Sequence, residues 1–151
     1  MKKEFNVKAQ MTHIALHVQD VEKSKAFYAK WAGMNEVHSH GDYLQGTKTV
    51  WMASPGQGDD FVIVLVPGAN DNKQAEGMRH IGLSVGSEKE VKKIASEAKK
   101  AGILHWDYAT YSWPIGTLCS VKDPDGHIVE ISYGQPLGPD FKKQKQSKPK
   151  R

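Results

Sequence analysis

One short stretch recurs in the chain at an offset of 67 residues. Met11–Val18 (MTHIALHV) returns as Met78–Val85 (MRHIGLSV). Each copy is followed by a helix-capping residue, Asp20 or Ser87, then by an amphipathic segment and a glycine. This order predicts a strand, a helix that begins after its N-cap, and a helix end at the glycine. The fold must therefore accommodate the same strand–helix unit twice.

Three further strands are predicted after each helix, separated by turn-forming residues. They lie near 36–40, 47–54 and 61–66 in the first half and near 104–108, 117–121 and 127–133 in the second. The chain is therefore predicted to be α+β, with two tandem βαβββ modules at about 11–67 and 78–135 that form curved mixed sheets.

The repeats are too short to be independent domains. Each half is too small to bury its own sheet face, so the sheets are expected to share a core or to pair with a second copy of the chain. Residues 11–135 are predicted to form a single domain with a polar linker at 68–77. Residues 1–10 are predicted to be a flexible leader and 136–151 a basic, disordered tail.

Composition excludes several classes of function. The net charge of +4 comes from the tail, because residues 1–139 hold 15 basic and 16 acidic side chains. Nucleic-acid binding is therefore not expected of the folded part. A solubilising role is favoured for the basic tail, and the alternative is an adaptor that binds a partner through the tail. No apolar run approaches the roughly 20 residues of a membrane span, and the N-terminus lacks a signal-peptide core. With Cys119 as the single cysteine, a cytoplasmic location is expected.

Three residues at repeat-related positions predict a metal site. His13 and His80 occupy matching positions in the first strand of each half, and Glu130 lies in the last strand of the second half. The counterpart of Glu130 in the first half is Val64. Taken singly, such residues are more often structural, but together two imidazoles and one carboxylate are typical of open mononuclear sites. Fe²⁺ is the leading candidate, and Mn²⁺, Co²⁺, Ni²⁺ or Zn²⁺ also fit.

Other residues are candidates for the surroundings of this site. His17 shares the strand face of His13 and is a candidate proton shuttle or substrate ligand. Ser132 shares the face of Glu130, and Ser120 lies on the preceding strand, so both are candidate pocket residues. Trp113 belongs to an aromatic stretch at 105–113, for which core packing is favoured over a stacking wall. Each of these residues also has a purely structural interpretation.

The motifs resemble those of the vicinal oxygen chelate superfamily. The opening at His13, the restart at His80 and the Asp-Pro-Asp-Gly-His-Ile-Val-Glu stretch at 123–130 carry the resemblance. This superfamily includes glyoxalase I, extradiol dioxygenases, fosfomycin-resistance transferases and bleomycin-binding proteins. The resemblance implies paired βαβββ modules, often completed across a homodimer. It also implies a metal on His13, His80 and Glu130 that chelates a small molecule through adjacent oxygens.

The chain departs from each of these family patterns, and the departures reduce the number of candidate reactions. Val64 replaces a glutamate, and His17 an arginine, of the glyoxalase I pattern. Ser120 replaces a tyrosine of the ring-cleavage and fosfomycin patterns. Trp113 stands near a histidine of the former, and Ala15 replaces a hydroxyl residue of the latter. We therefore expect a metal-dependent enzyme of dioxygenase-like or lyase/isomerase-like type that acts on a small oxygen-rich or aromatic molecule, with dioxygenase-like chemistry favoured over glyoxalase I chemistry. The alternative is an antibiotic-type binding or resistance protein without turnover.

Overall fold

The computed structural model describes residues 11, 13–42, 47–58, 60–68, 80–113 and 115–135. The predicted leader, the tail and the linker beyond Gly68 lie outside these residues. The chain divides into two compact units, residues 1–69 and 70–151. Each unit is described by itself.

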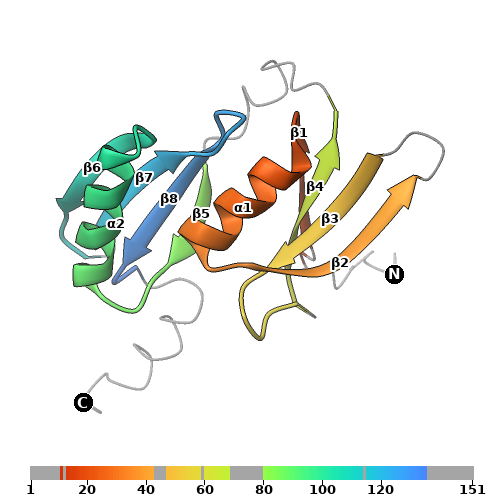
Figure 1. The fold of residues 1–151 in the computed structure, drawn as a ribbon. Coiled ribbons are helices and arrows are strands. Elements are labelled where there is room, and N and C mark those ends of the chain that lie inside the picture. Colours follow the sequence, from red (N-terminus) through yellow and green to blue (C-terminus); the bar gives the residue numbers. More distant parts are fainter. Residues whose placement is uncertain are drawn as a thin grey trace, which may run out of the picture. The chain divides into compact units, whose positions relative to one another are not determined.

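The described residues of unit 1 form four strands and one helix (Figure 1). Its elements are β1 (His13–Val18), α1 (Val21–Ala32), β2 (Asn35–Asp42), β3 (Thr47–Ala53) and β4 (Val62–Pro67). The strand order is β1-β4-β3-β2, with β1 parallel to β4 and the other pairs antiparallel. The first and last strands of the module are therefore neighbours.

Unit 2 repeats this topology. Its elements are β5 (Ile81–Ser84), α2 (Glu88–Lys100), β6 (Leu104–Thr110), β7 (Thr117–Lys122) and β8 (Ile128–Tyr133). The order is β5-β8-β7-β6, again with a parallel pair formed by the first and last strands. The predicted α+β class and the two βαβββ modules are confirmed.

The helices begin where the capping residues predict. The Asp20 side chain accepts a hydrogen bond from the backbone N–H of Lys23 at 3.0 Å. In α2, the Ser87 hydroxyl accepts one from the Glu90 N–H at 3.2 Å. Gly33 ends α1 with a left-handed φ of 63°, a conformation that glycine adopts without steric cost.

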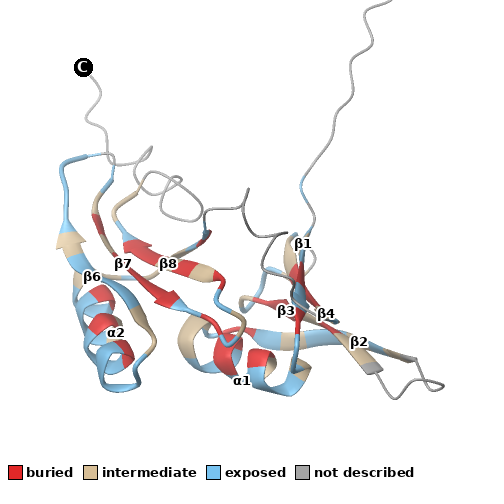
Figure 2. Ribbon diagram, turned by 90° about the horizontal axis from the view of Figure 1, so that it is seen from above, coloured by how far each residue is buried: buried red, intermediate tan, exposed pale blue. Residues whose placement is uncertain are grey.

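Each helix covers one face of its sheet. Along β1 the side chains of Leu16 and Val18 are buried, whereas His13, Ala15 and His17 are exposed. This alternation shows that the histidines lie on the face opposite the buried one. In unit 2 the buried residues gather on β7, on β8 and along one side of α2 (Figure 2). Neither described helix is long and apolar enough to cross a membrane.

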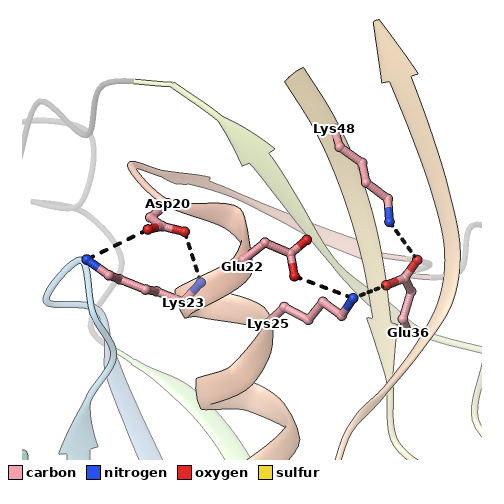
Figure 3. Close-up of polar contacts among 6 residues, drawn as sticks. All are labelled: Asp20, Glu22, Lys23, Lys25, Glu36 and Lys48. Atoms are coloured by element: carbon pink, nitrogen blue, oxygen red, sulfur yellow. Dashed lines mark hydrogen bonds and ion pairs between the residues drawn. The ribbon is translucent and has the colours of Figure 1, made fainter. Parts of the chain in front are cut away.

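A β-bulge interrupts the pairing of β2 with β3. Glu36 pairs with Met52 and His38 with Trp51, which leaves Val37 without a partner of its own. The Glu36 carboxylate lies beside this bulge and meets Lys25 Nζ of α1 at 2.6 Å and Lys48 Nζ of β3 at 3.2 Å (Figure 3). Glu36 thus ties the helix and both strands together at the point where the register shifts.

Replacing Glu36 with Gln should destabilise the protein at pH 7 by up to about 1 kcal/mol, the scale of such ion pairs. The hydrogen bond from Lys25, followed by that from Lys48, lowers the pKa of Glu36 from 4.5 to about 2. The contribution of the carboxylate is therefore complete above pH 4.5 and is lost as the pH falls through about 2. Urea unfolding of the parent and the variant between pH 7 and pH 3 should show a difference in the free energy of unfolding that becomes smaller below pH 4.5. A difference in the free energy of unfolding that grows on acidification would contradict this assignment. Glu88→Gln, which removes the carboxylate of an exposed ion pair, serves as the control.

Candidate functional site

The turn between β7 and β8 is built around a buried carboxylate. Asp123 is 4% exposed and accepts hydrogen bonds from the backbone N–H of Asp125 at 3.0 Å and of His127 at 2.8 Å. The ring Nδ1 of His127 lies 2.8 Å from the second carboxylate oxygen of Asp123. Gly126 completes the turn with φ 90°. These contacts fix the start of β8 at Ile128, two residues before Glu130.

Glu130 and His80 come together in unit 2. His80 Nε2 lies 3.5 Å from Glu130 Oε2, and the other carboxylate oxygen accepts a hydrogen bond from Gln135 Nε2 at 3.0 Å. The Glu130 side chain is 16% exposed and that of His80 is 41% exposed. One carboxylate oxygen is thus held by the protein while the other faces an accessible imidazole.

The spacing of these two groups suits a shared metal ion. Ligand bonds of about 2.0–2.2 Å place two ligands of one ion roughly 3.0–3.5 Å apart. The observed separation of 3.5 Å falls at the upper end of that range. A nitrogen and an oxygen donor are also the types that borderline divalent ions accept. Within either unit, however, the described residues provide no group of three His, Cys, Asp or Glu that could hold a metal.

Strand register identifies the counterparts of this half-site in unit 1. Gly82 pairs with Glu130, and Ala15 pairs with Val64. Val64 therefore occupies in unit 1 the place that Glu130 occupies in unit 2, as the repeat predicts. His13 is exposed on the strand that pairs with β4.

The remaining predicted residues lie in different surroundings. Ser120 is buried and pairs directly with Glu130 across β7 and β8. Ser132 is also buried, and its hydroxyl donates to the Leu83 carbonyl at 3.3 Å. His17 lies so close to Gly68 that a Cβ added there would approach its Nδ1 to 2.8 Å. Trp113 is 74% exposed.

The prediction that the aromatic stretch at 105–113 packs in the core is wrong. Trp106, Tyr108, Tyr111 and Trp113 are all exposed. Trp106 pairs with Ser120, which in turn pairs with Glu130, so Trp106 is two strands from the carboxylate in the same row. Register shifts on both sides of Trp106 break the alternation of β6, and the sequence alone could not assign these rings to a face.

A cavity of about 670 Å³ lies on unit 1 and is the clearest feature that sequence reasoning missed. His13, Ala15 and Val64 line it, so it opens on the strand face of the predicted ligand. Its other lining residues come from the bulge, β3, the β3–β4 loop and the start of β4: Val37, His38, Trp51, Gly58, Asp60 and Val62. Gln135 was also missed, because it follows the last strand and carries no motif.

Cys119 is an inert core residue. Its thiol is buried and lies 3.8 Å from the Val91 carbonyl of α2. Burial, with smaller contributions from Asp107 and Glu130, raises the pKa of the Cys119 thiol to about 11. A nucleophilic or metal-binding thiolate is therefore not supplied by this residue.

Residues 10–131 match the Glyoxalase/Bleomycin resistance protein/Dioxygenase superfamily. The chain belongs to this superfamily. It is 40% identical over 130 residues to Uncharacterized protein PA2024 of Pseudomonas aeruginosa, which covers 85% of this chain and 91% of that protein.

Two further proteins to which the chain is similar differ from each other in function. The chain is 30% identical over 129 residues to the Trivalent organoarsenical cleaving enzyme of Bacillus sp. (strain MD1), covering 80% of this chain and 71% of the enzyme. The fosfomycin resistance protein FosX of Listeria monocytogenes shares the fold with a TM-score of 0.66 at 22% identity, over 83% of this chain and 94% of FosX. Membership thus leaves the reaction to be argued from the site.

Replacing His127 with Ala should destabilise the protein by about 1–3 kcal/mol, because it removes a charge-assisted hydrogen bond from a buried carboxylate. The hydrogen bond to Asp123 is the main cause that raises the pKa of His127 above 6.5. The contribution is therefore complete below pH 6.5 and is lost as the pH rises through the raised value. Denaturant unfolding should show that the variant loses more free energy of unfolding, relative to the parent, at pH 6 than at pH 9. An equal loss at both pH values would mean that packing alone explains the effect, and His40→Ala, an exposed histidine on β2, is the control.

Proposed function

We propose that this protein is a metal-dependent enzyme that acts on a small oxygen-rich or aromatic molecule. His13, His80 and Glu130 are the proposed ligands of one divalent ion. The observation that carries the proposal is the meeting of His80 Nε2 and Glu130 Oε2 at 3.5 Å, with Gln135 holding the other carboxylate oxygen. His13 supplies the third donor, either from the same chain or from a second copy in a homodimer.

Two imidazoles and one carboxylate leave coordination positions open for a substrate with adjacent oxygens. Fe²⁺ is favoured, and Mn²⁺, Zn²⁺, Ni²⁺ or Co²⁺ suit the same donors. When bound, the ion supplies Lewis acidity, or redox chemistry if it is iron. Gln135 restrains the carboxylate, so Glu130 presents one oxygen in a fixed direction. This restraint is what a preorganised ligand requires.

The pocket residues receive unequal roles in this proposal. Ser120 stands directly opposite Glu130 and is the better placed of the two serines to meet substrate. The hydroxyl of Ser132 already donates to the Leu83 carbonyl, which favours a structural role. His17 stays a candidate proton shuttle, although it is not among the described residues that line the unit 1 cavity. Trp113 stays a candidate wall residue because its ring is exposed.

Dioxygenase-like chemistry is favoured over glyoxalase I chemistry. The glyoxalase I pattern has a glutamate where this chain has Val64. Val64 pairs with Ala15 across β1 and β4, and neither side chain carries a carboxylate. Val64 is also 6% exposed, which suits an apolar side chain. The unit 1 side of the site therefore contributes one imidazole and an apolar surface.

Cleavage of trivalent organoarsenicals is named for one relative but is not the activity we propose here. Trivalent arsenic is a soft centre that prefers thiolate ligands. The single cysteine of this chain, Cys119, is buried in unit 2 with its thiol pKa raised to about 11. The chain thus offers no accessible thiolate to capture such a substrate.

A second candidate function is the binding of a small molecule without turnover, as in a resistance protein. The cavity of unit 1 is the observation that favours it, because the cavity is lined largely by apolar and aromatic residues. Tight binding that survives metal removal, without product formation, would select this candidate. A cytoplasmic location is proposed for either function.

Metal content should decide the first proposal. Purified protein loaded with Fe²⁺ or Co²⁺ is expected to retain about one ion per assembled site. His80→Ala and Glu130→Ala should lower metal affinity by at least about 10–100-fold, the scale for losing a ligand or its support. Elemental analysis and Co²⁺ titration followed by visible absorption provide the measurement. His105→Ala, an exposed histidine of the same unit, should behave as the parent. Metal contents that are equal and substoichiometric in the parent and the variants would contradict the proposal.

Gln135→Met should test the support of Glu130. This change keeps the side-chain length and removes the N–H that donates to Oε1. We expect Co²⁺ affinity to fall about 10-fold, because an unrestrained carboxylate loses its fixed direction. The free energy of unfolding of the variant should stay within about 0.5 kcal/mol of the parent value, as for other partly exposed sites. An unchanged affinity would show that Gln135 does not position the ligand, and Tyr133→Phe is the neighbouring control.

A further inference from the structure

The face of the unit 1 sheet that carries His13 holds an ordered row of residues in strand register. Ala15 of β1 pairs with Val64 of β4, Val64 with Trp51 of β3, and Trp51 with His38 of β2. All four line the same cavity. The row therefore forms a continuous floor that runs from the strand of the proposed ligand to the opposite edge of the sheet.

The corresponding row of unit 2 has a different chemistry. There Gly82 pairs with Glu130, Glu130 with Ser120, and Ser120 with Trp106. Unit 2 thus has a carboxylate and a hydroxyl at the two central places. Unit 1 has a branched aliphatic residue and an indole at the same two places. The unit 1 row has the composition of a binding surface for an organic ring.

The indole of Trp51 is braced from one side. The His38 and Trp51 ring centroids lie 5.0 Å apart with an angle of 60° between the ring planes. The bulge at Val37 brings both Val37 and His38 to the cavity wall. A Cβ added to Gly58 would lie 3.3 Å from Val37 Cγ1, so the β3–β4 loop packs directly against the bulge. Trp51 is therefore held in a defined wall.

Among the described residues that line this cavity, one has an acidic side chain. Asp60 follows two backbone turns, in which Gln57 N–H donates to the Ser54 carbonyl and Asp60 N–H to the Gln57 carbonyl, both at 3.0 Å. No lysine or arginine is among the lining residues. A carboxylate beside an aromatic face attracts cations through charge and through the ring quadrupole.

We propose that the unit 1 cavity selects a planar aromatic substrate that carries an amine or another cationic group. The ring stacks on Trp51, and the cation faces Asp60. This assignment rests on the proposed function in one respect, because it places the rest of the substrate near His13. It concerns recognition alone and involves no covalent step.

The test uses full-length, metal-free protein and three matched probes in isothermal titration calorimetry. Tyramine carries an ammonium on a two-carbon arm, 3-(4-hydroxyphenyl)propionate carries a carboxylate on the same arm, and 4-ethylphenol carries neither. Tyramine should bind about 10-fold tighter than the propionate, since one charge contact near a protein surface has that scale. 2-Cyclohexylethylamine, which keeps the ammonium without an aromatic ring, should bind about 10-fold more weakly than tyramine.

Two variants assign the roles. Asp60→Asn should reduce the preference for tyramine over the propionate to about 2-fold or less, while Asp107→Asn, an exposed aspartate of unit 2, should leave it unchanged. Trp51→Leu should weaken tyramine binding about 10-fold, and Trp51→Phe should keep most of it. Thermal unfolding of each variant verifies that it is folded, and Trp31→Leu, on α1 and outside the cavity lining, is the control for loss of an indole.

The outcomes separate this inference from the proposed function. Equal affinity for the three phenolic probes overturns it, as does the absence of binding. A preference that survives Asp60→Asn overturns the role of Asp60. Metal analysis of separate samples of the same proteins, loaded with Fe²⁺ or Co²⁺, is independent of these results. Charge-selective binding without a metal site would contradict the proposed function alone, and a metal site without selectivity would contradict this inference alone.

Discussion

The parallel pairing of the first and last strand in each unit is the constraint on which the candidate site depends. In unit 2 it sets Gly82 opposite Glu130, and in unit 1 it sets Ala15 opposite Val64. A slip of one residue would turn the Glu130 carboxylate toward α2 and bring the neighbouring apolar residues to the other face. Val129 and Ile131 are each 1% exposed, so the slip would replace buried aliphatic contacts with a buried charge. Hydrophobic packing thereby fixes the direction of a polar side chain.

Two polar clusters outside the site hold neighbouring strands in place. The Asp123 carboxylate collects the backbone N–H groups of Asp125 and His127 and also meets the His127 ring, so β8 begins at a defined residue. In unit 1, Glu36 joins Lys25 and Lys48 beside the bulge that turns His38 and Val37 toward the cavity. Both clusters are satisfied locally and neither lines the cavity. Their contribution to function is geometric, because they decide which side chains reach the ligand-binding face.

Much of the fold follows from local sequence signals, and less of the site does. The repeat, the caps at Asp20 and Ser87 and the glycine after each helix suffice for two βαβββ modules, and the same repeat pairs Glu130 with Val64. The bulge at Val37 carries no such signal, because it arises from the fit of β2 to β3 and to the helix. The cavity formed by His38 and Trp51 could not be foreseen for that reason. Gln135 lies beyond the last strand, where periodicity has ended, and Trp106 lies between register shifts that cancel the period of two.

The difference between the two units has an electrostatic consequence for substrate choice. A divalent ion held by one carboxylate and neutral imidazoles keeps a formal charge of about +1, whereas a second carboxylate at Val64 would cancel it. A residual positive charge favours substrates that bind through oxygen atoms, especially ionised ones. Asp60 adds a negative charge to the same cavity that His13 lines. A molecule with an oxygen-rich end and a cationic end would satisfy both charges, whereas a purely anionic substrate would satisfy one and oppose the other. In the proposed function, the valine at position 64 and the carboxylate of Asp60 therefore favour the same kind of substrate.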